Sequence, residues 1–102
     1  MLIYNTTFHT EDEEHNNFLD FIKNTYIPEA IKSNFLHSPT LSRIFPHYEQ
    51  RGVSYSLQFK VKNIEVLDLW IENEGKSLHH ELKNKFGNKV AGFTTIMEEV
   101  EL

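Results

Sequence analysis

One alternating segment, residues 53–62, constrains the fold of this chain more than any other feature. Its odd-numbered positions are apolar and its even-numbered positions are polar, beginning with Val53 and ending with Lys62. Successive side chains of a β-strand point to opposite faces of a sheet, so the pattern predicts a strand with one buried and one polar face. The apolar face must pack against another element, which the rest of the chain must supply.

Three further strands are predicted around this segment. Residues 2–9 and 89–97 are rich in β-branched and aromatic types, and residues 41–48 lead into a hairpin connection at 49–52. Pro46 cannot donate a ladder hydrogen bond, so the strand over 41–48 is expected at an edge of the sheet.

Two long helices complete the predicted set of elements. Apolar residues recur at helical spacing over 11–26 and over 64–86. Pro28 is expected to stop or kink the first helix near Ile27, and a short second helix is expected over 29–34.

The ends of these helices carry recognisable capping residues. Thr10 is expected to cap the first helix, with Glu13 completing a capping box. Asn63 is expected to cap the long second helix, and Gly87 follows its last apolar residue.

The element order β-α-β-β-α-β predicts a ferredoxin-like α+β fold. Both helices then cover one face of a four-stranded antiparallel sheet. The length of 102 residues suits one domain over residues 1–102.

Composition narrows the possible functions. The net charge is −5, whereas a protein that binds nucleic acid needs a basic surface. There are no cysteines, which removes disulfides and thiolate chemistry. No signal peptide and no membrane-spanning stretch is apparent. We therefore expect a cytoplasmic protein without nucleic-acid or membrane partners.

Four segments resemble a family of small bacterial proteins of unknown function. They are YNTT at 4–7, FLDFIKNTYIPEAI at 18–31, YSLQF at 55–59 and KFGNKVAGFTTIMEEV at 85–100. The likeness covers almost the whole chain and is weakest over 35–50. That family is grouped with the dimeric α+β barrels, in which two ferredoxin-like sheets pack face to face. The resemblance implies this fold and a homodimer, and it brings no activity.

The same resemblance suggests a first candidate site, formed by Asn5, Trp70 and His80. Dimeric α+β barrels include haem-degrading and cofactor-independent monooxygenases. The haem-degrading ones use an Asn on the first strand, then a Trp and a His on the second long helix. On a regular helix, however, His80 lies about 180° from the apolar stripe and would face solvent. A haem site would need a helix break near Gly75, and Trp70 is otherwise a core-edge residue.

The polar face of the sheet is a second candidate site. Asn5, Ser56 and Gln58 would line a polar cavity if two sheets faced each other. The alternative is a hydrated face, or a dimer contact without a ligand.

A homodimer through the sheet faces is predicted from the last strand. Val90 and Ile96 lie on one row, whereas Ala91, Phe93 and Met97 lie on the other. An antiparallel sheet with one hydrated face usually alternates more cleanly, so the second row is expected to meet an identical sheet.

Established catalytic motifs are absent from the sequence. The six histidines include no H-x-x-x-H pair, so no metal site is expected. No serine has an evident base and orienting acid beside it. These observations favour a non-enzymatic module that binds a small molecule or a protein partner, without a cofactor. The alternative is a haem-binding, haem-degrading or cofactor-independent monooxygenase.

Overall fold

Four strands form one antiparallel sheet in the order β2-β3-β1-β4. The computed structural model describes residues 1–45 and 51–102. The strands are β1 (Leu2–Thr10), β2 (Leu36–Ile44), β3 (Val53–Val61) and β4 (Val90–Glu98). The ferredoxin-like order is confirmed, and β2 lies at an edge as predicted.

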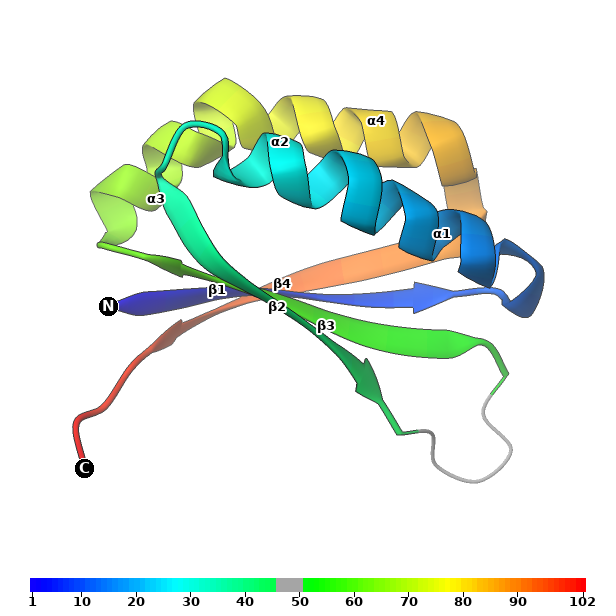
Figure 1. Cartoon of the computed structure of the whole chain (residues 1–102), viewed down its shortest axis with the longest axis horizontal. Helices are drawn as coiled ribbons and strands as arrows, with labels where there is room; N and C mark the ends of the chain where they lie inside the picture. The colour runs from blue at the N-terminus through cyan, green and yellow to red at the C-terminus, as the bar shows by residue number, and fades with distance from the viewer. Residues whose placement is uncertain (46–50) are drawn as a thin grey trace.

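Two helical segments cover one face of this sheet (Figure 1). Each contains a π-helical turn. The first comprises the 3₁₀ turn η1 (Asp12–Glu14), α1 (His15–Phe21), the π turn η2 (Ile22–Tyr26) and α2 (Ile27–Ile31). The second comprises α3 (Ile64–Trp70), the π turn η3 (Ile71–Gly75), α4 (Lys76–Phe86) and the 3₁₀ turn η4 (Gly87–Lys89). None of the described helices is long and apolar enough to span a membrane.

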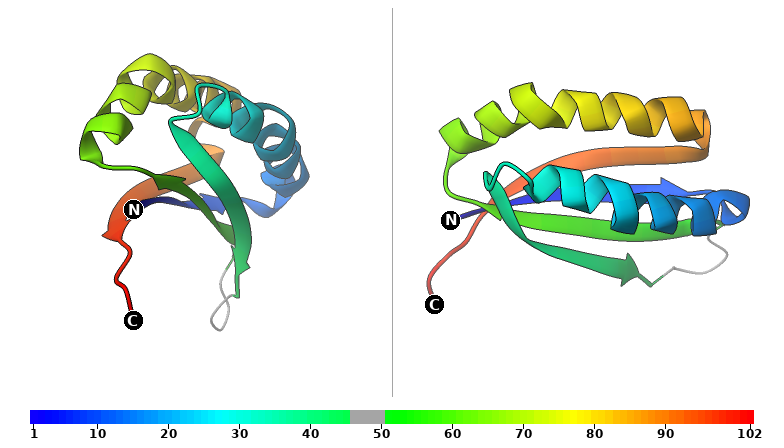
Figure 2. Two further views of the ribbon diagram at one scale, coloured as in Figure 1. Left: turned by 60° about the vertical axis from the view of Figure 1, so that its left-hand side comes forward. Right: turned by 45° about the horizontal axis from the view of Figure 1, so that its top comes forward.

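The core lies between the helices and one row of each central strand. Phe8, Leu57 and Phe59 are almost fully buried there, together with Phe18 and Trp70 from the helices. The opposite side of the sheet is covered by no described element, and both views in Figure 2 show it open. We call this side the open face; the strand registers place Asn5, Ser56, Gln58, Thr95 and Phe93 on it.

The second strand begins earlier than predicted. It spans Leu36–Ile44 rather than 41–48, and Pro46 and the first half of the predicted connection at 49–52 lie outside the described residues. Ser38 has a φ of +55°, and the pairing with β3 shifts between His37 and Thr40. A bulge therefore accommodates Pro39 within an edge strand, and the Ser-Pro pair that resembles a turn in the sequence lies inside the strand.

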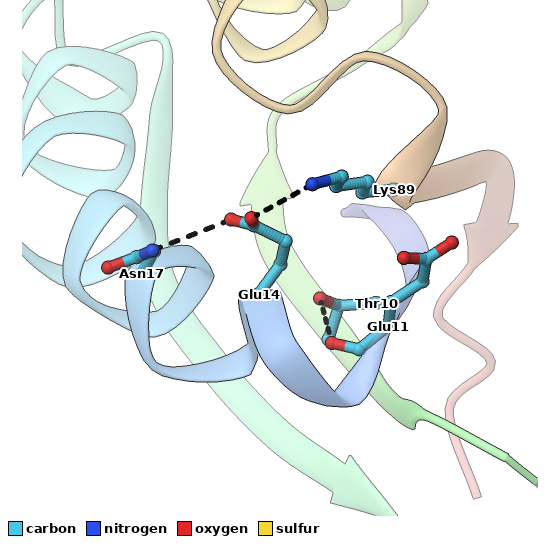
Figure 3. Close-up of polar contacts among 5 residues, drawn as sticks. All are labelled: Thr10, Glu11, Glu14, Asn17 and Lys89. Carbon is cyan, nitrogen blue, oxygen red and sulfur yellow. Dashed lines mark hydrogen bonds and ion pairs between the residues drawn. The ribbon is translucent and has the colours of Figure 1, made fainter.

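The predicted capping box at Thr10 and Glu13 is wrong. Thr10 is the last residue of β1 and is fully buried, and its hydroxyl donates to the Glu11 carbonyl oxygen at 3.1 Å (Figure 3). The chain turns here because the Glu11 amide donates to the Lys89 carbonyl oxygen at 3.0 Å. Glu14 adds an ion pair with Lys89, with 3.6 Å between Oε1 and Nζ.

Pro28 does not end the first helix. The helix continues through a π turn directly before it, and the Ile27 amide donates to the Ile22 carbonyl oxygen five residues back. The shift in hydrogen bonding suits a residue that has no amide hydrogen, because Pro28 enters as a first-turn residue of α2. The predicted short helix at 29–34 is therefore not a separate element, because only residues 29–31 are helical and they end α2.

The cap of the second helical segment allows a first quantitative prediction. Asn63 accepts a hydrogen bond from the Val66 amide at 2.9 Å. Substituting Asn63→Ala should lower the free energy of unfolding by about 1 kcal/mol, because it leaves that amide without its partner. Asn63→Asp keeps an acceptor and should cost less. Urea denaturation measures both, and equal stability of Asn63→Ala and the native chain would contradict the prediction.

Candidate functional site: a cleft beneath helix α4

A cleft of about 570 Å³ opens between α4 and the β1–β4 side of the sheet. Its floor is formed by the helix-facing row of β1, namely Tyr4, Thr6 and Phe8. Helical residues supply the opposite wall, with Tyr26, Trp70 and Gly75 among them. Apolar and aromatic walls with a few polar groups are typical of small-molecule sites. We call this cavity the α4 cleft.

The cleft exists because the helices do not cover this part of β4 and because the side chains of β4 are too small to fill the space. Gly92 and Thr94 lie on its helix-facing row, and both remain exposed. A Cβ atom on Gly92 would lie 3.1 Å from Cδ1 of Phe8, which is tighter than an ordinary contact. A larger side chain at position 92 would therefore displace the Phe8 ring on the cleft floor.

Both π turns border the cleft. Tyr26 ends η2, while Ile71 and Gly75 belong to η3, and all three are lining residues. A Cβ atom on Gly75 would lie 2.7 Å from Cζ3 of Trp70, so the glycine lets the indole pack against the helix. Since π turns occur frequently at functional sites, their presence on both helices at one cavity supports this location.

Three hydroxyl groups give the cleft its internal polarity. Burial raises the pKa of Tyr4, and hydrogen bonding with the Thr6 side chain partly offsets that rise. Burial also raises the pKa of Tyr26, and the proximity of Tyr4 raises it further. Both phenols therefore stay protonated in neutral solution. Each can donate one hydrogen bond to a bound molecule, and Thr6 provides a third hydroxyl.

Trp70 lies between the cleft and the core. It is 1% exposed, and its indole nitrogen donates to the Ala30 carbonyl oxygen at 2.9 Å. The Tyr4 ring meets it edge-on, with 5.6 Å between ring centroids. The tryptophan therefore joins the two helical segments and also forms part of the cleft wall.

Asn5, Trp70 and His80 do not meet at one site. Asn5 points to the open face, on the side of β1 opposite Tyr4 and Thr6. His80 is exposed on α4, as the helical phase predicts, and the neighbouring His79 lines the cleft instead. The helix is not broken near Gly75, because η3 continues directly into α4.

The open face does bring Asn5, Ser56 and Gln58 together. Asn5 pairs directly with Gln58 across β1 and β3, and Ser56 donates to the Asn5 side-chain oxygen at 2.5 Å. The Asn5 amide nitrogen donates to the Thr7 hydroxyl at 3.1 Å. Asn5 is 7% exposed, and its hydrogen bonds are satisfied within the sheet.

A serine–histidine contact also occurs at the open face. His9 Nδ1 lies 2.8 Å from the Ser54 hydroxyl, a pairing between distant segments that the sequence does not reveal. Ser54 therefore has a histidine beside it, which is one of the two partners that the sequence did not reveal for any serine. No orienting acid is hydrogen-bonded to His9 within the described ranges, so the pair lacks the third member of a triad. Across residues 1–45 and 51–102, no group of three or more His, Asp or Glu side chains could hold a metal ion.

The cleft residues other than Trp70 were not anticipated from the sequence. One signal was available: Thr6 interrupts the apolar row formed by Leu2, Tyr4 and Phe8. A second was the pair Gly92 and Thr94, which replaces bulky residues on the helix-facing row of β4. Small or polar residues in the core row of two neighbouring strands indicate space that the helices do not fill.

The sheet order and helix placement define a ferredoxin-like α+β protein, and solved structures share this fold. An EthD (ethyl tert-butyl ether degradation) family protein from Bacillus halodurans is 19% identical, with a TM-score of 0.70 over 98% of this chain and 100% of that chain. A dimeric ferredoxin-like protein from an uncultured marine organism is 14% identical, with a TM-score of 0.71 over 100% and 97%. A Streptomyces coelicolor monooxygenase in complex with nanaomycin D is 9% identical, with a TM-score of 0.60 over 99% and 90%.

These identities establish similarity of fold alone. No curated protein matches the sequence. Residues 1–100 match the domain of unknown function DUF4286, and the chain belongs to that family. The predicted resemblance to a family of unknown function with the dimeric ferredoxin-like fold is thereby confirmed.

Proposed function

We propose that this chain is a cytoplasmic bacterial homodimer that binds a small, largely aromatic molecule in the α4 cleft of each protomer without transforming it. The observation that carries the proposal is the cleft itself. A volume of about 570 Å³ is within the range of small-molecule sites, and the lining includes aromatic residues and the hydroxyl-bearing residues Tyr4, Thr6 and Tyr26.

The open face supports the homodimeric part of the proposal. Phe93 is 64% exposed on it, and Met97 lies on the same row. An identical sheet related by a two-fold axis would cover both and would bury Asn5 and Ser56 with their hydrogen bonds already made. Two structural neighbours are dimeric ferredoxin-like proteins. The cleft lies on the other side of the sheet, so it stays open in such a dimer.

Binding can be tested with the neutral fluorescent probe N-phenyl-1-naphthylamine. Trp70 is the chain's single tryptophan and lines the cleft, so its emission should transfer to a probe bound there. We expect saturable energy transfer with one probe per protomer.

Thr94→Phe should weaken this binding at least tenfold, because a phenyl ring would occupy the mouth of the cleft. Thr94→Val removes the hydroxyl at nearly constant volume and should retain binding. Equal affinities of the Thr94→Phe variant and the native chain would contradict the proposed site.

A monooxygenase activity is the second candidate. It is favoured by the monooxygenase neighbour that holds nanaomycin D, and by the position of Trp70 and His79 on the cleft. Titration with haemin tests its haem-dependent form. A Soret shift that is lost in His79→Ala and kept in His80→Ala would favour haem binding over the non-enzymatic module.

A further inference from the structure

The charges around the α4 cleft differ from those of the protein as a whole. The chain carries 15 Asp and Glu against 10 Lys and Arg. The described residues that line the cleft nevertheless include Lys76, His79 and Lys83 and no acidic residue. An apolar cavity whose lining carries two lysines and a histidine but no carboxylate, in an acidic protein, is chemically suited to an anion.

These three residues form a row along one side of α4. Positions 76, 79 and 83 are spaced i, i+3 and i+7, which places them on the same helical face, next to the mouth of the cleft. The hydroxyls of Tyr4 and Thr6 lie across the cavity on the strand floor. The polar groups therefore lie on two sides of the cleft. The lysines and His79 are on the helix, and the neutral hydroxyl groups are on the sheet.

The two lysines of the row are not equally available. Lys76 already forms an ion pair with Glu72, with 2.9 Å between Nζ and Oε1. Lys83 forms no ion pair with any residue that the structure describes. His79 lies one helical turn before Lys83 and can donate from its ring. Lys83 and His79 are thus the groups free to meet a ligand.

We propose that the α4 cleft selects small aromatic acids, whose ring packs against Trp70 and Tyr26 and whose acid group is held by Lys83 and His79. This inference rests on the proposed binding function and specifies its ligand class. The aromatic part of the ligand follows from the aromatic lining, which includes Tyr4, Tyr26 and Trp70, and the acid group follows from Lys83 and His79. Lys83 and His79 are both exposed, so salt should screen their contact with the acid group.

The test compares two probes that differ in one charged group. 1-Anilinonaphthalene-8-sulfonate is N-phenyl-1-naphthylamine with an added sulfonate. Energy transfer from Trp70 reports both in the full chain. We expect the sulfonate to bind about three- to tenfold more tightly to the native protein at low salt. At an ionic strength of about 0.5 M, the electrostatic screening length falls to roughly 4 Å. Raising the salt concentration to this level should therefore remove most of the preference for the sulfonate.

Charge variants locate the acid group. Lys83→Gln should weaken sulfonate binding about three- to fivefold and Lys83→Glu about tenfold, while binding of the neutral probe changes less than about twofold. Lys62→Glu is the matched control, because Lys62 is an exposed lysine that does not line the cleft. It should leave both affinities nearly unchanged.

The outcomes separate the two levels of the proposal. If both probes bind equally, without salt dependence and without an effect of Lys83→Glu, the anion preference is overturned and the binding module stands. If neither probe gives energy transfer, or Thr94→Phe fails to block it, the binding function itself is overturned. The salt titration uses only native protein, so it decides the question even if a variant folds poorly.

Discussion

Replacing Trp70 with alanine is expected to lower the free energy of unfolding by about 3–5 kcal/mol. The side chain is 1% exposed and occupies the junction of both helical segments, β1 and the glycine of η3. Its removal leaves a cavity between these elements and the Ala30 carbonyl without its donor. Domains of this size are stable by about 5–15 kcal/mol, so the variant should approach the limit of folding.

Two companion variants separate packing from the indole hydrogen bond. Trp70→Phe keeps most of the apolar volume and loses the bond to Ala30, so it should cost less than Trp70→Ala. Leu69→Ala changes a neighbouring side chain that is 51% exposed and should cost under about 0.5 kcal/mol. Urea denaturation followed by circular dichroism measures all three. A similar midpoint for Trp70→Ala and Leu69→Ala would contradict the burial described here.

A charge on the open face should convert the proposed homodimer to a monomer. In Phe93→Glu, two symmetry-related carboxylates would be buried between the sheets without partners, which costs several kilocalories per mole. Light scattering should then give a mass near 12.1 kDa, half that of the native dimer. Phe93 itself is 64% exposed in the protomer, so the fold should tolerate the change.

Ile96→Glu is the matched control for that experiment. Ile96 lies on the same strand and is 49% exposed, but the register with Tyr4 places it on the helix-facing row. The control variant should remain dimeric. If light scattering gave the same assembly mass for Phe93→Glu and Ile96→Glu, the result would contradict a dimer formed through the open face.

Local sequence patterns predicted the structure correctly where no tertiary contact competed with them. The alternation over Val53–Val61 predicted β3 and both faces of the sheet, and the cap at Asn63 predicted the start of α3. The errors fall where tertiary contacts override a local signal. The second strand was predicted to begin at residue 41, yet a bulge between His37 and Thr40 lets β2 begin at Leu36. Thr10 resembles a cap, yet it is buried at the end of β1.

The candidate cleft was harder to predict, because it depends on space that is absent from the sequence. Trp70 was identified from the resemblance to haem-degrading barrels, but whether it borders a cavity depends on the π turn that follows it and on Gly75 in that turn. The helical stripe predicted that His80 faces solvent, but that His79 lines a cleft depends on how α4 lies over the sheet. The contact between His9 and Ser54 likewise depends on the pairing of β1 with β3.

Native mass spectrometry of the full chain with N-phenyl-1-naphthylamine tests the central claim most directly, because it reports assembly and occupancy together. The account predicts a species of about twice 12.1 kDa that carries two probe molecules, and a Thr94→Phe dimer that carries none. A species of 12.1 kDa at all protein concentrations, or a dimer whose probe stoichiometry is unchanged by Thr94→Phe, would contradict it.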